Sequence, residues 1–429
     1  MIGPPAPSPG PDPTRHSRLV TASPIYYGWV ALMAATVGLA MTIPGQTVGV
    51  SVFLDRVLDD LDLSRSAASS AYAAATLLGA LALPTVGRLV DRHGPRRSVV
   101  VIAAAFAVAC ITMSLARGLI TLLLGFTLIR ALGQGALGLV SVHEVNIWFV
   151  RRRGLAVGIA GAGFAVATAL APAGINALIE PFGWRMAYFL LGMIVLLLMV
   201  PVGGGLFRDH PENYGIAADP PGRGDRRSAE PVERHYRPEE ARRTLTFWLY
   251  VAGGFLTGAL GTGLVFHHYS IMAQSGVPRS TASVMFIAFG FVIAGSGLVT
   301  GFLIDRIPPR FLLSGSLGLM GITMLAATRI STAAAVVAYG TGLGVMQGMS
   351  QSLQAGVYAH YFGRLHIGAI RGLAGAVNIA GSALGPLLLA VAFDSSGTYT
   401  PVLVITAFLP LSVAAVVPFL RLKRNGHIR

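Results

Sequence analysis

"GRLVDRHGPRR" at residues 87–97 and "GFLIDRIPPRF" at residues 301–311 are two copies of one pattern, separated by 214 positions. The same shift pairs "SRSAAS" (64–69) with "PRSTAS" (278–283). It also pairs four further positions with their counterparts: Gly154, Gly158, Gly161 and Pro172 with Gly368, Gly372, Gly375 and Pro386. Because one shift aligns three separated regions, we expect two halves that arose by duplication, as in many secondary transporters.

The composition places these halves in a membrane. The chain has 429 residues, of which 54% are hydrophobic and only 12% are charged, about half the charged share of a soluble domain. Apolar runs long enough to cross a bilayer predict helices near 26–54, 66–86, 97–116, 118–148, 152–179, 184–206, 244–271, 280–304, 311–328, 332–361, 366–393 and 399–420. The predicted fold class is an all-α membrane protein with twelve transmembrane helices in two pseudo-symmetric six-helix bundles.

The distribution of the basic residues predicts how the chain is oriented in the membrane. Of the 32 Lys and Arg residues, 25 fall on the side that holds both termini and the central segment, and six fall on the other side. The positive-inside rule therefore predicts cytoplasmic termini and a multi-pass protein of the bacterial cytoplasmic membrane. This distribution also explains the net charge of +14 without nucleic acid as a partner. The predicted organisation is a disordered tail (1–25), an N-terminal bundle (26–207), a linker (208–243), a C-terminal bundle (244–421) and a short tail (422–429).

Several of these motifs resemble a known family. The 87–97 segment resembles the signature loop of the major facilitator superfamily between helices 2 and 3, and "LIRALGQG" (128–135) resembles its helix-4 motif. "WFVRRRGLAVGIAGAGFAVA" (148–167) is similar to the helix-5 signature of the monocarboxylate transporters. The resemblance implies the major facilitator fold and alternating access. It implies a small organic anion as substrate, moved with a proton, and no enzyme activity.

The acid-binding residues described for lactate carriers do not carry over from this resemblance. Gly45 and Gln46 stand where those carriers have a lysine in helix 1. Ile293 and Gly297 stand where they have an aspartate and an arginine in helix 8. The alternative function is therefore a proton-antiport efflux carrier for drugs or metabolites.

Arg130 is the one basic residue that falls on neither side of the predicted membrane. A central arginine costs roughly 2.5–3.5 kcal/mol on insertion scales, so it should face water, a partner or an anion. No acidic residue lies at mid-depth in any predicted helix, and the second half has Gly344 at the matching position. We expect Arg130 to bind a substrate carboxylate in a polar cavity. The alternative is a structural role, with bonds to backbone carbonyls and to side chains such as Gln46.

Polar side chains at mid-depth are the other candidates for substrate binding. Gln347, Gln351 and Gln354 fall on one face of a predicted helix, which should line a cavity or another helix. The remaining candidates lie on three other helices: Gln46, Thr47, Tyr72 and Asn378. The alternative for this set is hydrogen bonding between helices.

Charges at the predicted cytoplasmic ends form a candidate conformational latch. A carboxylate at a helix end can bond to the amides of a neighbouring helix and to arginines, and such contacts can form in one state and part in another. The predicted members are Asp91, Arg92, Arg96, Glu144, Arg151, Asp305, Arg306 and Arg310. The alternative is that they are solvated loop charges.

His267 and His268 are candidate proton sites near the outer end of the seventh predicted helix, because histidine titrates near neutral pH. They could instead be interfacial hydrogen bonders. No spacing resembles a metal site, a phosphate-binding loop or a nucleophile–base pair, so we expect no metal, no cofactor and no enzyme. The expected partners are the substrate, a proton and the lipid bilayer, and we expect a functional monomer.

Overall fold

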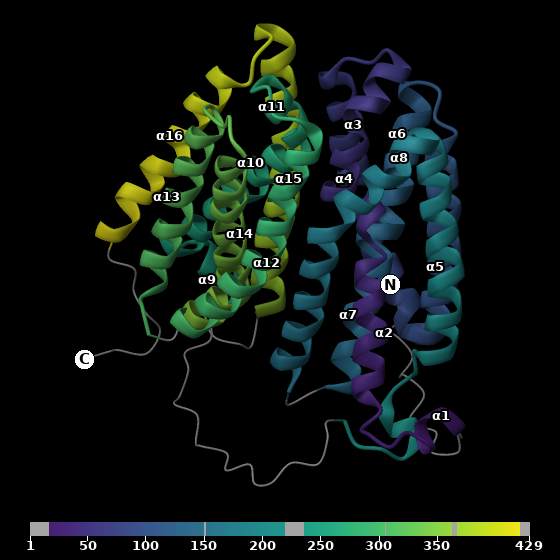
Figure 1. The fold of residues 1–429 in the computed structure, drawn as a ribbon. Helices are drawn as coiled ribbons and strands as arrows, with labels where there is room; N and C mark the ends of the chain where they lie inside the picture. Colours follow the sequence, from purple (N-terminus) through teal and green to yellow (C-terminus); the bar gives the residue numbers. More distant parts are fainter. Residues whose placement is uncertain (1–16, 150–151, 219–235, 305, 363–366, 421–429) are drawn as a thin grey trace, which may run out of the picture.

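The computed structural model describes residues 17–149, 152–218, 236–304, 306–362 and 367–420. These residues form helices and their connections, and none of them is in a β-strand. Figure 1 shows two helical bundles side by side, one purple to teal and one green to yellow, which correspond to the two predicted halves.

The N-terminal half follows the predicted order with one interruption. The first predicted helix is divided into α2 and α3 by a short 3₁₀ turn, η1. The fourth contains a π-helical segment, η2, between α6 and α7. The elements are α1 (Arg18–Thr21), α2 (Gly28–Ala40), η1 (Ile43–Gly45), α3 (Thr47–Leu61), α4 (Arg65–His93), α5 (Pro95–Ser114), α6 (Leu119–Ile129), η2 (Arg130–Leu137), α7 (Gly138–Trp148) and α8 (Arg153–Leu206).

The C-terminal half begins after the described parts of the linker, which hold two short helices, η3 and α9. In this half the seventh predicted helix is divided into α10 and α11. The elements are η3 (Pro211–Tyr214), α9 (Pro238–Arg242), α10 (Leu245–Phe266), α11 (His268–Gln274), α12 (Arg279–Ile304), α13 (Pro309–Ala327), α14 (Ala333–Phe362), α15 (Ile367–Ser396), α16 (Thr400–Val416) and η4 (Val417–Phe419).

The number of membrane crossings agrees with the prediction of twelve. The described residues contain ten helical segments long and apolar enough to cross a membrane. One of them, Leu155–Leu206, holds two crossings, because Gly183 has a φ of 74° and turns the chain between the predicted helices 152–179 and 184–206. The 30-residue α14 completes the set. The predicted fold class is thus confirmed.

The break in the first helix lies beside the π-helical segment. Pro44 lacks an amide hydrogen, so a regular helix cannot continue through it with all its hydrogen bonds. Gly45 then allows a close approach, because a Cβ atom there would lie 2.2 Å from the carbonyl oxygen of Ile129. The broken helix therefore presents its backbone directly to Arg130, the first residue of η2.

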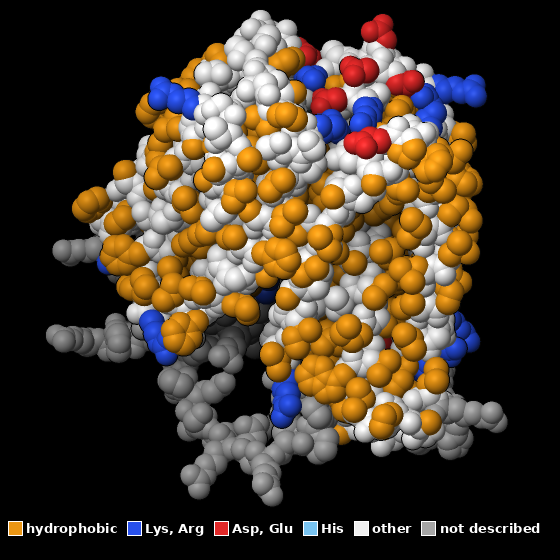
Figure 2. Space-filling model, in the orientation of Figure 1, with side chains coloured by type: hydrophobic (Ala, Val, Ile, Leu, Met, Phe, Trp, Pro, Cys, Tyr) orange, Lys and Arg blue, Asp and Glu red, His pale blue; other side chains and the backbone are white. Residues whose placement is uncertain are grey.

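The two halves meet along three sets of helices. α8 contacts α12, α4 contacts α15, and α3 contacts both α10 and α11. We call the end where α8 finishes and α10 begins the linker end, and the end where α3 finishes and α4 begins the far end. Figure 2 shows hydrophobic side chains over the middle of the visible face and charged side chains near its two ends, as a multi-pass membrane protein requires.

Candidate functional site

Arg130 is buried between α4 and the break in the first helix, with 5% of its surface exposed. Its Nε donates to Thr76 Oγ1 at 3.1 Å, and its Nη1 makes a long bond of 3.4 Å to the Gly45 carbonyl. Its Cζ lies 4.7 Å from the centre of the Tyr72 ring. Among the described residues no carboxylate pairs with it. Neutral dipoles and an aromatic face therefore surround the guanidinium, and no carboxylate of the described residues neutralises its charge.

Thr47 of the first predicted helix acts on this arginine through Tyr72 of the second. The hydroxyl groups of Thr47 and Tyr72 bond to each other at 2.7 Å, and Tyr72 is fully buried. Gln46 donates to Thr42 Oγ1 at 3.1 Å and forms no hydrogen bond with Arg130. The hydroxyl pair fixes the ring over which Arg130 lies, so these side chains act on its position.

A cavity of about 230 Å³ connects Arg130 with the other half, and we call it the inter-half cavity. Its polar lining from the N-terminal half is Thr76, Arg130 and Gln134. Asn378 and Ser382 of α15 line it from the C-terminal half. Arg130 therefore faces a space that both halves enclose, and proteins built from two such repeats often bind small molecules at this interface.

A second cavity, of about 300 Å³, lies within the C-terminal half, and we call it the C-half cavity. Gln347, Gln351 and Gln354 of α14 line it together with Asn378. Gln354 is bound to the protein, since its Nε2 donates to the Tyr250 carbonyl at 3.1 Å. The structure thus brings the predicted glutamine face and Asn378 together, while Thr47 and Tyr72 line neither cavity.

Arg371 also lines the C-half cavity, and the sequence analysis did not single it out. The charge distribution assigned it to the loop before the eleventh predicted helix, although it is already inside α15. Its position could have been recognised from the helical period. Arg371, Gly375, Asn378 and Ser382 follow one another by four, three and four residues, which places them on one face of α15.

The duplicated loop arginines of the predicted latch bind within their own halves. Arg96 Nε donates to the Gly204 carbonyl near the end of α8 at 2.8 Å. Its counterpart Arg310 donates through Nη1 to the Leu420 carbonyl, after η4, also at 2.8 Å. Each arginine therefore fastens the third helix of its half to the end of the sixth.

The other latch residues are placed as follows. Glu144 is fully buried, and its Oε1 accepts the backbone amide of Arg208 at 3.0 Å. Arg92 is exposed, and the Cζ of Arg306 lies 3.3 Å from the ring centre of Phe302. Arg151 and Asp305, and the side chain of Asp91, lie outside what the structure describes. No hydrogen bond between described residues joins these groups across the halves, so the latch stays a prediction.

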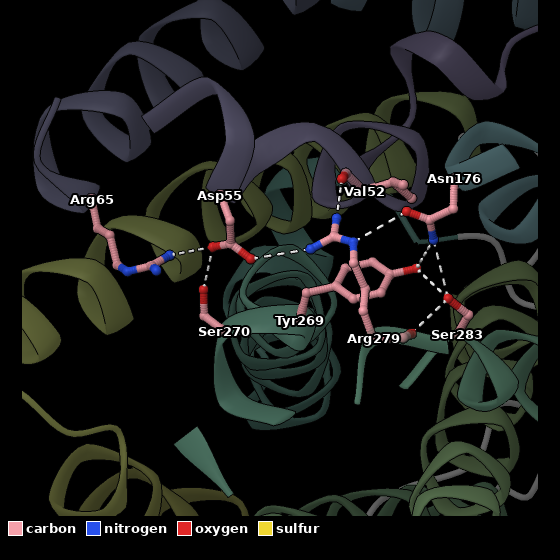
Figure 3. A network of polar contacts seen from close by, with 8 residues as sticks. All are labelled: Val52, Asp55, Arg65, Asn176, Tyr269, Ser270, Arg279 and Ser283. Carbon is pink, nitrogen blue, oxygen red and sulfur yellow. Dashed lines mark hydrogen bonds and ion pairs between the residues drawn. The ribbon is translucent and has the colours of Figure 1, made fainter. Parts of the chain in front are cut away.

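A polar network at the far end joins the halves, and the sequence analysis missed it (Figure 3). At its centre is Asp55 of α3, whose Oδ1 lies 2.8 Å from Nη1 of Arg65 and whose Oδ2 lies 3.5 Å from Nη1 of Arg279. Arg65 and Arg279 are the two arginines that the 214-residue shift pairs. One arginine from each half binds the same carboxylate. The repeated Arg-Ser pairs in the sequence were therefore the feature from which this network could have been suspected.

The rest of this far-end network consists of hydrogen bonds across the same interface. Ser270 donates to Asp55 Oδ1 at 2.6 Å, and Arg279 Nε donates to Asn176 Oδ1 at 3.1 Å. Beside the network, the Ser66 amide donates to Asp394 at 2.8 Å. Between described residues, all hydrogen bonds that join the two halves lie at this end: Asp55–Ser270, Val52–Arg279, Asn176–Arg279, Asn176–Tyr269, Asn176–Ser283 and Ser66–Asp394.

The two candidate proton sites are fully buried and hydrogen-bonded to backbone. His267 Nε2 donates to the Pro386 carbonyl at 2.8 Å, and its Nδ1 lies 3.1 Å from the Tyr399 hydroxyl. His268 Nε2 donates to the Ala282 carbonyl at 2.8 Å. Neither lines the cavities around Arg130 and Arg371. Within the described ranges no group of His, Cys, Asp and Glu side chains is arranged to hold a metal ion.

Comparisons with known proteins agree with this architecture. Monocarboxylate transporter 11 of Homo sapiens is 28% identical over 407 residues, which cover 90% of this chain and 81% of that protein. The oxalate:formate antiporter of Oxalobacter formigenes is 22% identical over 65% of this chain and 64% of its own length. A solved bacterial homologue of the human lysosomal transporter Spinster, in an inward-facing and occupied conformation, has the same fold. Its TM-score is 0.65 at 18% identity, and the match covers 92% of this chain and 94% of that one.

The family model of the Major Facilitator Superfamily matches residues 28–271 and 268–428, which together include both bundles. The resemblance noted from the loop and helix-4 motifs is confirmed. The chain belongs to the major facilitator superfamily of membrane transporters.

Proposed function

We propose that this chain moves small organic anions of the monocarboxylate type across the bacterial cytoplasmic membrane by alternating access, with a proton. In this proposal both termini are cytoplasmic and the monomer is the functional unit. The single observation that carries the substrate class is Arg130. It is a buried guanidinium without a carboxylate partner among the described residues, and it faces a cavity that both halves line.

The polar side chains of the two cavities support an anion as the substrate. Amides, hydroxyls and guanidinium groups line part of the space next to Arg130, beside the apolar side chains Leu83, Leu139 and Ile379, and these polar groups can orient a carboxylate by hydrogen bonds. The relatives named monocarboxylate transporter and oxalate:formate antiporter support the same class.

Alternating access requires a conformation that is closed at one end of the bundle and open at the other. The far-end network and the other inter-half hydrogen bonds support closure of the far end in this conformation. Figure 2 shows a hollow between the halves at the linker end. Since the excess of Lys and Arg assigns that end to the cytoplasm, we propose that this conformation receives substrate from the cytoplasmic side.

The proposed proton has two candidate carriers. One is His267 or His268, and the other is the carboxyl group of the substrate itself, since no carboxylate lines either cavity. Loss of stimulation by a pH gradient in His267→Gln or His268→Gln, with exchange of substrate retained, would support a histidine site. Unchanged stimulation in both variants would assign the proton to the substrate.

The test is uptake of labelled lactate and pyruvate into proteoliposomes with and without a pH gradient. Charge-assisted hydrogen bonds contribute about 1.5–3 kcal/mol, so Arg130→Ala should lower kcat/KM by roughly 10- to 150-fold. Arg117→Ala removes an exposed arginine at the far end and should leave uptake unchanged. Transport of neither acid by the wild type would refute the monocarboxylate class, and full activity of Arg130→Ala would refute the proposed role of Arg130 in binding the anion.

A further inference from the structure

The two cavities adjoin, and each is lined by one arginine. Asn378 and Ser382 line both the inter-half cavity and the C-half cavity, so the two adjoin at these side chains. Arg130 lies in the first cavity and Arg371 in the second. No Asp or Glu lines either one, and among the described residues neither arginine has a carboxylate partner. Among the described residues, the joined space therefore holds two guanidinium groups, the buried Arg130 and the exposed Arg371, and no acidic side chain.

The path between the two charges is open along one face of α15. Arg371 and Asn378 are seven residues apart, which corresponds to about 10 Å along a helix axis. Gly375 lies between them and lines the C-half cavity. A Cβ atom at Gly375 would meet no atom within 4 Å, so the space beside this part of the helix is free. A ligand can therefore extend from the Asn378 region toward Arg371.

Uncommitted amides line the same path. Gln347 and Gln351 face the C-half cavity, and their side chains make no hydrogen bond to another described residue. This distinguishes them from Gln354, whose amide nitrogen and oxygen bind Tyr250 and Tyr358. Free amides in a cavity can donate hydrogen bonds to a ligand that is bound there.

We propose that the preferred substrate is a dicarboxylate with a short carbon chain, held by Arg130 at one end and by Arg371 at the other. This inference rests on the proposed transport of organic anions through Arg130, and it replaces the monocarboxylate by an anion with a second carboxylate. A dianion can form charge-assisted hydrogen bonds with both guanidinium groups, whereas a monocarboxylate binds one of them and leaves the exposed Arg371 to solvent. Arg371 is thus the residue that distinguishes substrates with two carboxylates from those with one.

The experiment compares matched acids in proteoliposomes: succinate with butyrate, and adipate with hexanoate. Arg371→Gln should lower kcat/KM for the dicarboxylates about tenfold or more and leave that of the monocarboxylates within about twofold. Arg371→Lys keeps the charge and should retain most dicarboxylate transport. Arg243→Gln is the matched control, because it removes an exposed arginine at the linker end outside both cavities. Elution of each variant as a single folded species checks its integrity.

Each outcome decides between the two proposals. If the wild type carries butyrate or hexanoate and neither dicarboxylate, the dicarboxylate inference fails and the anion proposal stands. An equal fall in kcat/KM for both kinds of acid in Arg371→Gln would also overturn the inference, because Arg371 would then attract anions in general and would not bind the second carboxylate. Transport of none of the four acids, together with none of lactate or pyruvate, would overturn the anion proposal itself.

Discussion

Replacement of Asp55 by asparagine should shift the protein away from the conformation with the closed far end. Asp55 binds one arginine from each half, and the substitution removes its charge while keeping its shape. The Arg65 contact lies within the N-terminal half, so it does not by itself distinguish two arrangements of the halves. The contacts with Arg279 and Ser270 cross the interface and are the ones whose loss changes the equilibrium.

The magnitude follows from the geometry of these contacts. The side chains of Asp55 and Arg279 are 22% and 27% exposed, so their ion pair at 3.5 Å is partly screened by solvent. A pair of this kind contributes up to about 1 kcal/mol. Asparagine can still accept a hydrogen bond from Ser270, but that bond loses its charge assistance, worth about another 1 kcal/mol. A total of 1–2 kcal/mol corresponds to roughly a 5- to 30-fold change in the equilibrium.

The assay measures the distance between spin labels on the two halves at the far end. Arg117→Cys and Arg329→Cys place the labels at exposed positions on α5–α6 and α13–α14 connections, in a Cys110→Ser background. Wild type should give mainly the shorter distance, and Asp55→Asn should populate the longer one. Asp60→Asn is the matched control, because Asp60 binds Arg185 within the N-terminal half.

Two results would refute this reasoning. An unchanged distance distribution in Asp55→Asn would mean that the far-end network does not bias the conformation. An equal shift in Asp60→Asn would mean that loss of any acidic charge at this end has the same effect, and that the crossing contacts carry no special weight.

Gly45→Val should lower the thermal unfolding midpoint in detergent, because its Cβ would lie 2.2 Å from the Ile129 carbonyl and overpacking costs about 1–3 kcal/mol. Gly158→Val, where a Cβ meets nothing within 4 Å, is its control, and an equal fall in both would contradict the close approach. Gln351→Leu should raise KM about 2- to 12-fold at unchanged kcat, because it removes one neutral hydrogen bond to the ligand. An unchanged KM would exclude Gln351 from substrate contact.

The sequence predicted the fold because the relevant signals are local or repeated. Long apolar runs locate the helices by length alone, and the 214-residue shift divides them into two halves. The breaks inside helices were harder to predict from the sequence. The "IPG" at 43–45 contains the residues that break a helix, but the apolar run continues across it and hides the break.

The candidate site was predicted in part. Arg130, Gln347, Gln351 and Asn378 were identified as polar groups in apolar surroundings, and the structure places all four on the two cavities. Arg371 was assigned to a loop because it lies only four residues after the start of its helix, where a boundary error changes the interpretation.

The far-end network could not be identified from sequence for a different reason. Asp55 and Arg279 are 224 positions apart and belong to different halves, so nothing local connects them. Only the placement of α3 against α11 and α12 brings the partners together. The paired arginines 65 and 279 were visible as a repeat, but the single carboxylate between them has no counterpart that a repeat could reveal.

The contacts of Arg96 and Arg310 have a mechanical consequence. Each joins the start of one membrane helix to the end of another in the same half, so the third and sixth helices of a half are held together at the linker end. In the proposed alternating access, two halves that turn as blocks amplify small rotations. Over a membrane-spanning length of about 30 Å, a turn of about 10° moves the opposite tips by about 5 Å. In the proposed cycle, a change of one or two contacts around Asp55 would therefore move the opposite end of the molecule without any helix having to bend.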